Sequence, residues 1–212
     1  MSNYMNDLDL TQLDEKAYVW VGREFPPLLR NAVADDDEDS QGGQIPTLIG
    51  VNRALYIPEE LGPVMEFLRY PRPYGELKQW MTDVTEDGDA LLAWLEEEGL
   101  VIALAPKTGS MASLGGLHLE PNAMLLPEEG QEGDEPIPGL TMISDAEGVN
   151  TAVELTPITR ALLFGYPDEA LAEVIGKIVS DYGVDSESVT GELLKNLAMW
   201  MRDDFAFLLF ME

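Results

Sequence analysis

The chain has 212 residues, and its 40 acidic side chains against 12 Lys and Arg give a formal net charge of −28. Such a chain repels phosphate backbones and anionic membrane surfaces, which argues against direct nucleic-acid binding and membrane association. The chain has no cysteine and a single histidine, His118. Disulfide frameworks, thiolate chemistry and multi-histidine metal sites are therefore excluded. No cofactor loop is recognisable either, so we expect no cofactor and no metal.

Apolar residues make up 45% of the chain, enough for a packed core in one large or two small domains. The first ten residues lack the basic and apolar regions of a secretory signal. No apolar run approaches the roughly 20 residues that span a bilayer. The sequence therefore favours a folded protein of the cytoplasm.

In chain order, residues 1–17 are polar and acidic and predict a flexible arm, with a short helix as the second interpretation. A strand is expected at 17–21, and a second at 28–33 after two prolines. The run of five acids at 35–39 predicts an exposed loop. Calcium binding is a second interpretation of this run, but it lacks the alternating ligands and the closing glutamate of an EF-hand loop.

Two short strands are expected within 45–57, followed by a helix from Pro58 to about residue 69. Further helices are predicted at 76–82 and 87–98, then a strand at 100–105. The second part of the chain predicts strands at 117–126, 151–155 and 205–210. Its helices are expected at 157–164, at 169–182, and from about 185 to 200.

Several landmarks recur in the same order along the chain. Ile45-Pro46 matches Ile137-Pro138, an offset of 92 residues, and Trp94 matches Trp200, an offset of 106. Tyr70-Pro71 and Tyr166-Pro167 form another such pair. The set predicts an internally duplicated α+β protein. Its halves, 18–106 and 107–212, would each contain three helices and short antiparallel strands.

Residues 86–104, EDGDALLAWLEEEGLVIAL, resemble the end of a winged helix, where the third helix runs through Gly-Leu into the wing. The second half departs from this pattern, because Phe205 stands where Gly-Leu is expected. In winged-helix proteins the third helix usually reads DNA through basic residues, whereas here it is acidic. The resemblance therefore implies an acidic tandem module that grips protein, similar to accessory subunits of chromosome-condensing complexes and to small peptide-binding domains.

No nucleophile is recognisable, and none of the many carboxylates stands out as an acid–base pair. We expect a structural role for His118, and core positions for Trp80, Trp94 and Trp200. The predicted function is a non-catalytic, protein-binding adaptor or accessory subunit with a basic or apolar partner. The alternative is a nucleic-acid mimic that inhibits a DNA-binding protein. Association between copies of the chain stays open. Candidate partner-binding residues are the helix-end acids Asp87, Asp89, Glu96, Glu97, Glu98, Asp203 and Asp204.

Overall fold

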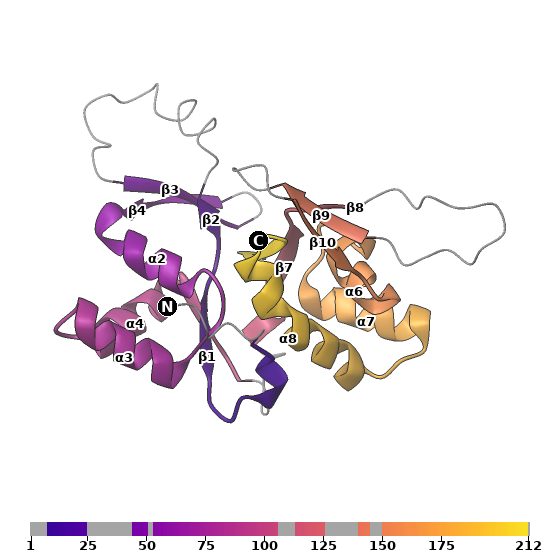
Figure 1. Cartoon of the computed structure of the whole chain (residues 1–212), viewed down its shortest axis with the longest axis horizontal. Coiled ribbons are helices and arrows are strands. Elements are labelled where there is room, and N and C mark those ends of the chain that lie inside the picture. The colour runs from indigo at the N-terminus through magenta and orange to yellow at the C-terminus, as the bar shows by residue number, and fades with distance from the viewer. Residues whose placement is uncertain are drawn as a thin grey trace, which may run out of the picture.

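The computed structural model describes residues 8–24, 44–50, 53–105, 113–125, 140–144 and 150–211. The strand expected at 28–33 and the acidic run at 35–39 lie outside these residues. In Figure 1 the first half of the chain (indigo to magenta) and the second half (orange to yellow) lie side by side. Helices and strands occur in both, so the α+β class is confirmed.

The first half contains strands on both sides of a helical segment. Its elements are η1 (Leu10–Gln12), β1 (Ala17–Trp20), β2 (Arg23–Glu24), β3 (Gln44–Gly50), β4 (Arg53–Pro58), η3 (Glu59–Leu61), α2 (Gly62–Leu68), β5 (Arg72–Pro73), α3 (Tyr74–Val84), α4 (Gly88–Glu97) and β6 (Val101–Leu104). The three predicted helices are present, and η1 lies where a short helix was the second interpretation of residues 1–17. The two-residue strands β2 and β5 carry too little pattern to be predicted.

The second half follows a similar course. Its elements are β7 (Leu117–Pro121), β8 (Met124–Leu125), β9 (Leu140–Ser144), β10 (Asn150–Glu154), α6 (Pro157–Arg160), η4 (Ala161–Gly165, a π-helical turn), α7 (Leu171–Tyr182), α8 (Ser186–Arg202) and β11 (Ala206–Phe210). The side chain of Asp185 caps α8 by accepting a hydrogen bond from the Ser188 amide at 2.7 Å.

Strand pairing repeats between the halves. The strand that follows the helices pairs antiparallel with the first long strand, β6 with β1 and β11 with β7. A hairpin follows a short strand in each half, β2 with β3 and β4, and β8 with β9 and β10. One parallel contact, Phe210 opposite Gly50, joins β11 to β3 and so links the halves.

Strand β1 is shared between two apolar cores because successive side chains point to opposite faces. Tyr18 and Trp20 pack with α2, α3 and α4 in the first half. Ala17 and Val19 face the other way, into the core that α7 and α8 form in the second half. Leu10 of the predicted arm joins that second core and is fully buried. Residues 1–7 lie outside the described part of the chain.

Helices α4 and α8 end with the same hydrogen bonds. The amide of Leu100 donates to the carbonyl of Leu95 at 2.9 Å, and the amide of Phe205 donates to that of Trp200 at 2.7 Å. This six-to-one bond is typical of a Schellman motif. Trp200 thus corresponds to Leu95 and not to Trp94, so the sequence pairing of the two tryptophans is shifted by one residue.

In both turns, the residue just before the donor of the six-to-one bond has a left-handed backbone conformation. Gly99 has φ +72°, and Asp204 has φ +56°. Glycine adopts this region without steric cost, whereas an L-residue is strained there by about 1 kcal/mol. Asp204 therefore stands where glycine is expected, and Phe205 takes the place of Leu100.

Candidate functional site

The outer face of α4 carries an exposed apolar stripe. Ala90, Ala93 and Trp94 are all exposed, and their spacing places them on one side of the helix with Glu97. The Trp94 side chain is 41% exposed, so the expected core position of Trp94 is wrong. Leu92 and Trp94 are two positions apart, about 200° around the helix, so both cannot face the core. The core receives Leu92.

The matching helix α8 is covered on more sides. It packs against α7 and α6 within its own half and against η1 from the first half. Figure 1 shows α8 in the middle of the molecule, near β1, and α4 with α3 at the outer end of the first half. Trp200 is consequently 1% exposed. Trp80 is half-buried on α3, where its ring stacks on Phe67 with centroids 4.2 Å apart.

Five of the seven candidate acids flank the stripe on α4. Asp87 and Asp89 lie at the start of the helix, and Glu96, Glu97 and Glu98 lie at its end. All five are exposed. We call this region, with Ala90, Ala93 and Trp94, the α4 surface.

The other two candidate acids lie elsewhere, at the end of α8, and both are engaged in ion pairs. Asp203 accepts from the guanidinium of Arg202 at 2.7 Å. Asp204 accepts from Arg69 of the first half. Burial opposes the charge of Arg69, but the hydrogen bond and charge of Asp204 raise its pKa above the ordinary value. Asp204 therefore links the two halves, Asp203 pairs with its own neighbour in the chain, and neither belongs to the α4 surface.

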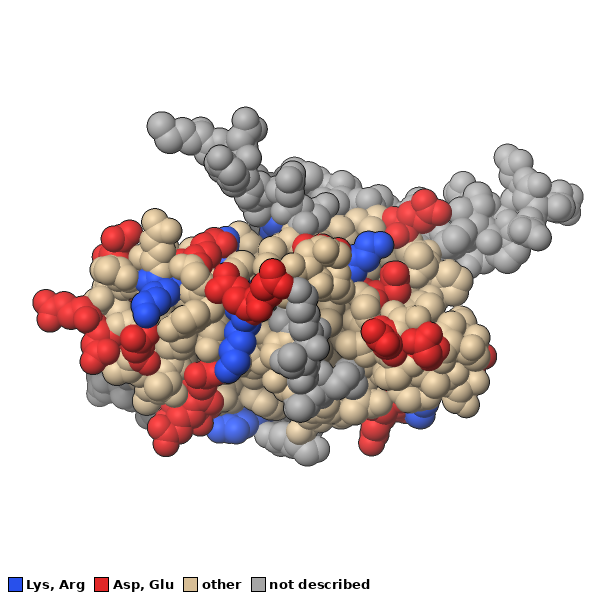
Figure 2. All heavy atoms as spheres, turned by 90° about the horizontal axis from the view of Figure 1, so that it is seen from below, with Lys and Arg blue, Asp and Glu red and all other residues tan. Residues whose placement is uncertain are grey.

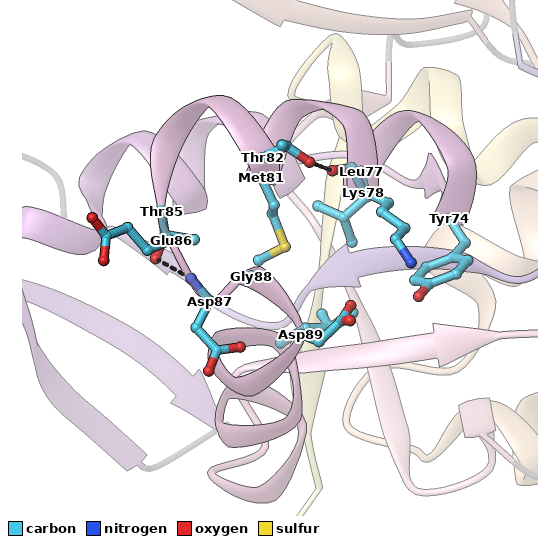
Figure 3. A pocket seen from close by; sticks show the side chains of 11 residues that line it. Tyr74, Leu77, Lys78, Met81, Thr82, Thr85, Glu86, Asp87, Gly88 and Asp89 are labelled. Atoms are coloured by element: carbon cyan, nitrogen blue, oxygen red, sulfur yellow. Dashed lines mark hydrogen bonds between the residues drawn. The ribbon is translucent and has the colours of Figure 1, made fainter.

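A cavity of about 200 Å³ adjoins the first turn of α4, where α3 ends (Figure 3). Figure 3 shows Glu86 and Asp87 on one side of it and Lys78 and Tyr74 on the other. The helices approach closely here because residue 88 is glycine. A Cβ atom at Gly88 would lie 2.9 Å from the Cβ of Met81.

A second cavity, of about 480 Å³, lies where the halves meet, and we call it the junction cavity. Its buried apolar lining comes from both halves: Trp20, Met65, Met201 and Ala206. Its polar lining also comes from both halves: Arg23, Glu24, Glu66, Arg69, Asn122 and Asp204. These residues are up to 186 positions apart in the chain (20 to 206), so no local sequence signal indicated the cavity.

His118, on β7, is 4% exposed, and both of its ring nitrogens have partners. Nδ1 lies 3.0 Å from the main-chain oxygen of Glu169, and Nε2 lies 2.8 Å from Oε2 of Glu120. Because a carbonyl oxygen only accepts, Nδ1 carries a proton. The ring therefore links β7 to the segment that precedes α7.

Within the described ranges, no three His, Asp or Glu side chains are grouped so that they could hold a metal ion. None of the helices there is long and apolar enough to cross a membrane. Comparison with protein-family models, curated proteins and solved structures finds no significant match. The case for function consequently depends on the surfaces of this chain.

Proposed function

We propose that this protein is a non-catalytic protein-binding module and that its partner docks on the α4 surface. The exposure of Trp94 carries the proposal. A large aromatic side chain that is left in water on a helix, beside two exposed alanines, is typical of a binding anchor. The partner would offer an apolar pocket for the indole, surrounded by Lys and Arg.

The carboxylates around Trp94 supply the second part of the argument. Asp87 and Asp89 at one end and Glu96 to Glu98 at the other carry five negative charges along the ten-residue helix, about 15 Å long, and its two cap residues. Charges at the rim of an interface mainly steer encounter and exclude wrong partners, while the central aromatic residue supplies affinity. The α4 surface has that arrangement.

We also infer that the two halves descend from one repeated module of strands and three helices. The repeated strand pairing and the matched ends of α4 and α8 support this inference. The winged-helix resemblance stays a prediction. It does not extend to the wing in the described residues, because β6 pairs with β1, which precedes the helices.

Nucleic-acid mimicry stays the alternative. It requires carboxylates in continuous rows that imitate phosphates. On the face shown in Figure 2, acidic side chains form separate groups with Lys and Arg between them. An exposed tryptophan also has no phosphate-like role, so the α4 surface favours docking of a protein through an apolar anchor.

The test is affinity capture from the native lysate with the tagged full chain, comparing wild type with Trp94→Ala. If the partner uses the indole as its anchor, Trp94→Ala should weaken the free energy of binding by about 2 kcal/mol or more, which is at least about thirtyfold in affinity. A triple variant, Glu96→Gln with Glu97→Gln and Glu98→Gln, should mainly slow association and reduce the salt dependence. The matched control removes three exposed acids elsewhere: Glu60→Gln, Glu173→Gln and Glu187→Gln.

Partners lost with Trp94→Ala but retained by the control would support the proposal. If the control variant loses partners as readily as the α4 variants, then overall charge governs binding. If the captured proteins instead bind DNA, compete with DNA and ignore Trp94→Ala, the mimic replaces the adaptor.

A further inference from the structure

The junction cavity has an apolar floor that lies below a charged rim. Trp20, Met65, Met201 and Ala206 are each no more than 8% exposed and form the floor. The two methionines come from different halves. Unbranched thioether side chains adapt to the shape of an inserted group, and such residues are common at binding surfaces that accept several side chains.

Arg23 stands at the rim with donor capacity to spare. Its guanidinium lies over the ring of Phe207, 4.4 Å from the centroid, and Nη1 donates to Oδ1 of Asn122 at 2.8 Å. A guanidinium has five N–H donors, and this is the one hydrogen bond given for the Arg23 guanidinium within the described structure. Stacking on Phe207 and the bond to Asn122 fix the plane of the guanidinium, so its remaining donors face a defined direction.

The charges of the rim restrict what can enter. Two arginines, Arg23 and Arg69, stand against three carboxylates, Glu24, Glu66 and Asp204. Arg69 is already engaged by Asp204 and lies 3.8 Å from Glu66. With a chain of net charge −28 around it, the cavity disfavours a free anion. A neutral carbonyl oxygen avoids this repulsion and still accepts from Arg23.

We propose that the junction cavity is a peptide-binding site. It would receive one large aliphatic side chain of an extended partner segment, flanked by basic residues. The side chain enters between Met65 and Met201 above Trp20, a main-chain carbonyl accepts from Arg23, and the basic flanks meet Glu24 and Glu66. This site is separate from the α4 surface, and its test does not depend on the partner of that surface.

The test uses three short peptides and the full-length protein at physiological salt. Acetyl-Lys-Leu-Lys-amide should bind with a dissociation constant on the order of 1 mM, as expected for a ligand of this size. It should shift the amide NMR signals of Gly22, Met65, Met201 and Ala206 in a saturable way. Acetyl-Lys-Gly-Lys-amide, equal in charge, should bind about tenfold more weakly because it lacks the buried side chain. Acetyl-Glu-Leu-Glu-amide should bind more weakly still.

Two variants and two controls locate the site. Arg23→Gln should lower the affinity for the leucine peptide roughly fivefold through loss of a charged donor. Met65→Trp should abolish binding by filling the cavity. Arg53→Gln, which removes an equal charge from an exposed position on β4, should leave binding unchanged, and so should Trp94→Ala. Equal binding of the leucine and glycine peptides would overturn the proposal, as would insensitivity to Arg23→Gln.

Discussion

Helices α4 and α8 end in the same kind of turn but lie in different environments. Both end in a six-to-one hydrogen bond, and both lead into a strand that pairs with the first long strand of its half. The carbonyl that accepts this bond in α8 belongs to Trp200, which is buried between the halves. In α4 it belongs to Leu95, while Trp94, one residue earlier, is exposed. Burial of one helix and exposure of the other follow from what covers each, and η1 of the first half covers α8.

The comparison indicates that the two helices have different structural roles. Helix α8, in the middle of the molecule, joins the two halves through the shared core and through the pairing of Asp204 with Arg69. The α4 end is free of that task, and its surface is available for a partner. Three predictions test this difference, beginning with the largest expected effect.

The first prediction concerns the shared core. Fragments 1–106 and 107–212 should each fail to unfold cooperatively, because separation exposes the face of β1 that carries Ala17 and Val19 and uncovers α8. The measurement is urea unfolding followed by circular dichroism for each fragment, for their mixture and for the full chain. Recovery of structure on mixing would confirm that the halves complete one another. A fragment that unfolds cooperatively alone would show that the halves are separate domains.

The second prediction contrasts the two tryptophans. Trp200→Ala should lower the free energy of unfolding by about 3–5 kcal/mol, as expected for an aromatic residue removed from a packed core. Trp94→Ala should change it by less than about 1 kcal/mol, because the side chain is 41% exposed. Urea denaturation of both variants gives the comparison. Equal costs would mean that the α4 surface belongs to the core, and the proposed docking role would lose its basis.

Elements with strong local patterns were predictable from the sequence. Helix α7, whose apolar residues recur at helical spacing and which Gly183 ends, was expected at 169–182 and is observed at Leu171–Tyr182. The last helix, expected from about residue 185, is observed as α8 from Ser186, with Asp185 as its cap. Short elements were not predictable, since two-residue strands such as β2 and β5 depend on partners distant in the chain.

The candidate site was predictable only in part. The acids of α4 were identified because charge is legible in the sequence. The exposure of Trp94 was missed because a core position was expected for it, whereas Leu92, two residues earlier, takes the core face of the helix. The junction cavity could not be predicted at all, because Arg23, Met65 and Met201 meet only through the packing of the halves.

The third prediction concerns the left-handed residue after each helix. Gly99→Ala should cost about 1 kcal/mol, because φ is +72° and the new Cβ atom would lie 3.4 Å from the ring of Phe210. Asp204→Gly should be close to neutral. Relief of about 1 kcal/mol of backbone strain offsets the loss of a half-exposed ion pair with Arg69, which is worth about 0–1 kcal/mol.

Asp204→Ala separates these two contributions, because it keeps a Cβ atom in the left-handed region and removes the carboxylate. It should be less stable than Asp204→Gly by about 1 kcal/mol in urea denaturation. If Asp204→Gly and Asp204→Ala are destabilised equally, by about 2 kcal/mol or more, then the ion pair of the carboxylate contributes more to stability than the backbone strain costs. Asp204 would then have been retained in place of glycine because its pairing with Arg69 holds the two halves together.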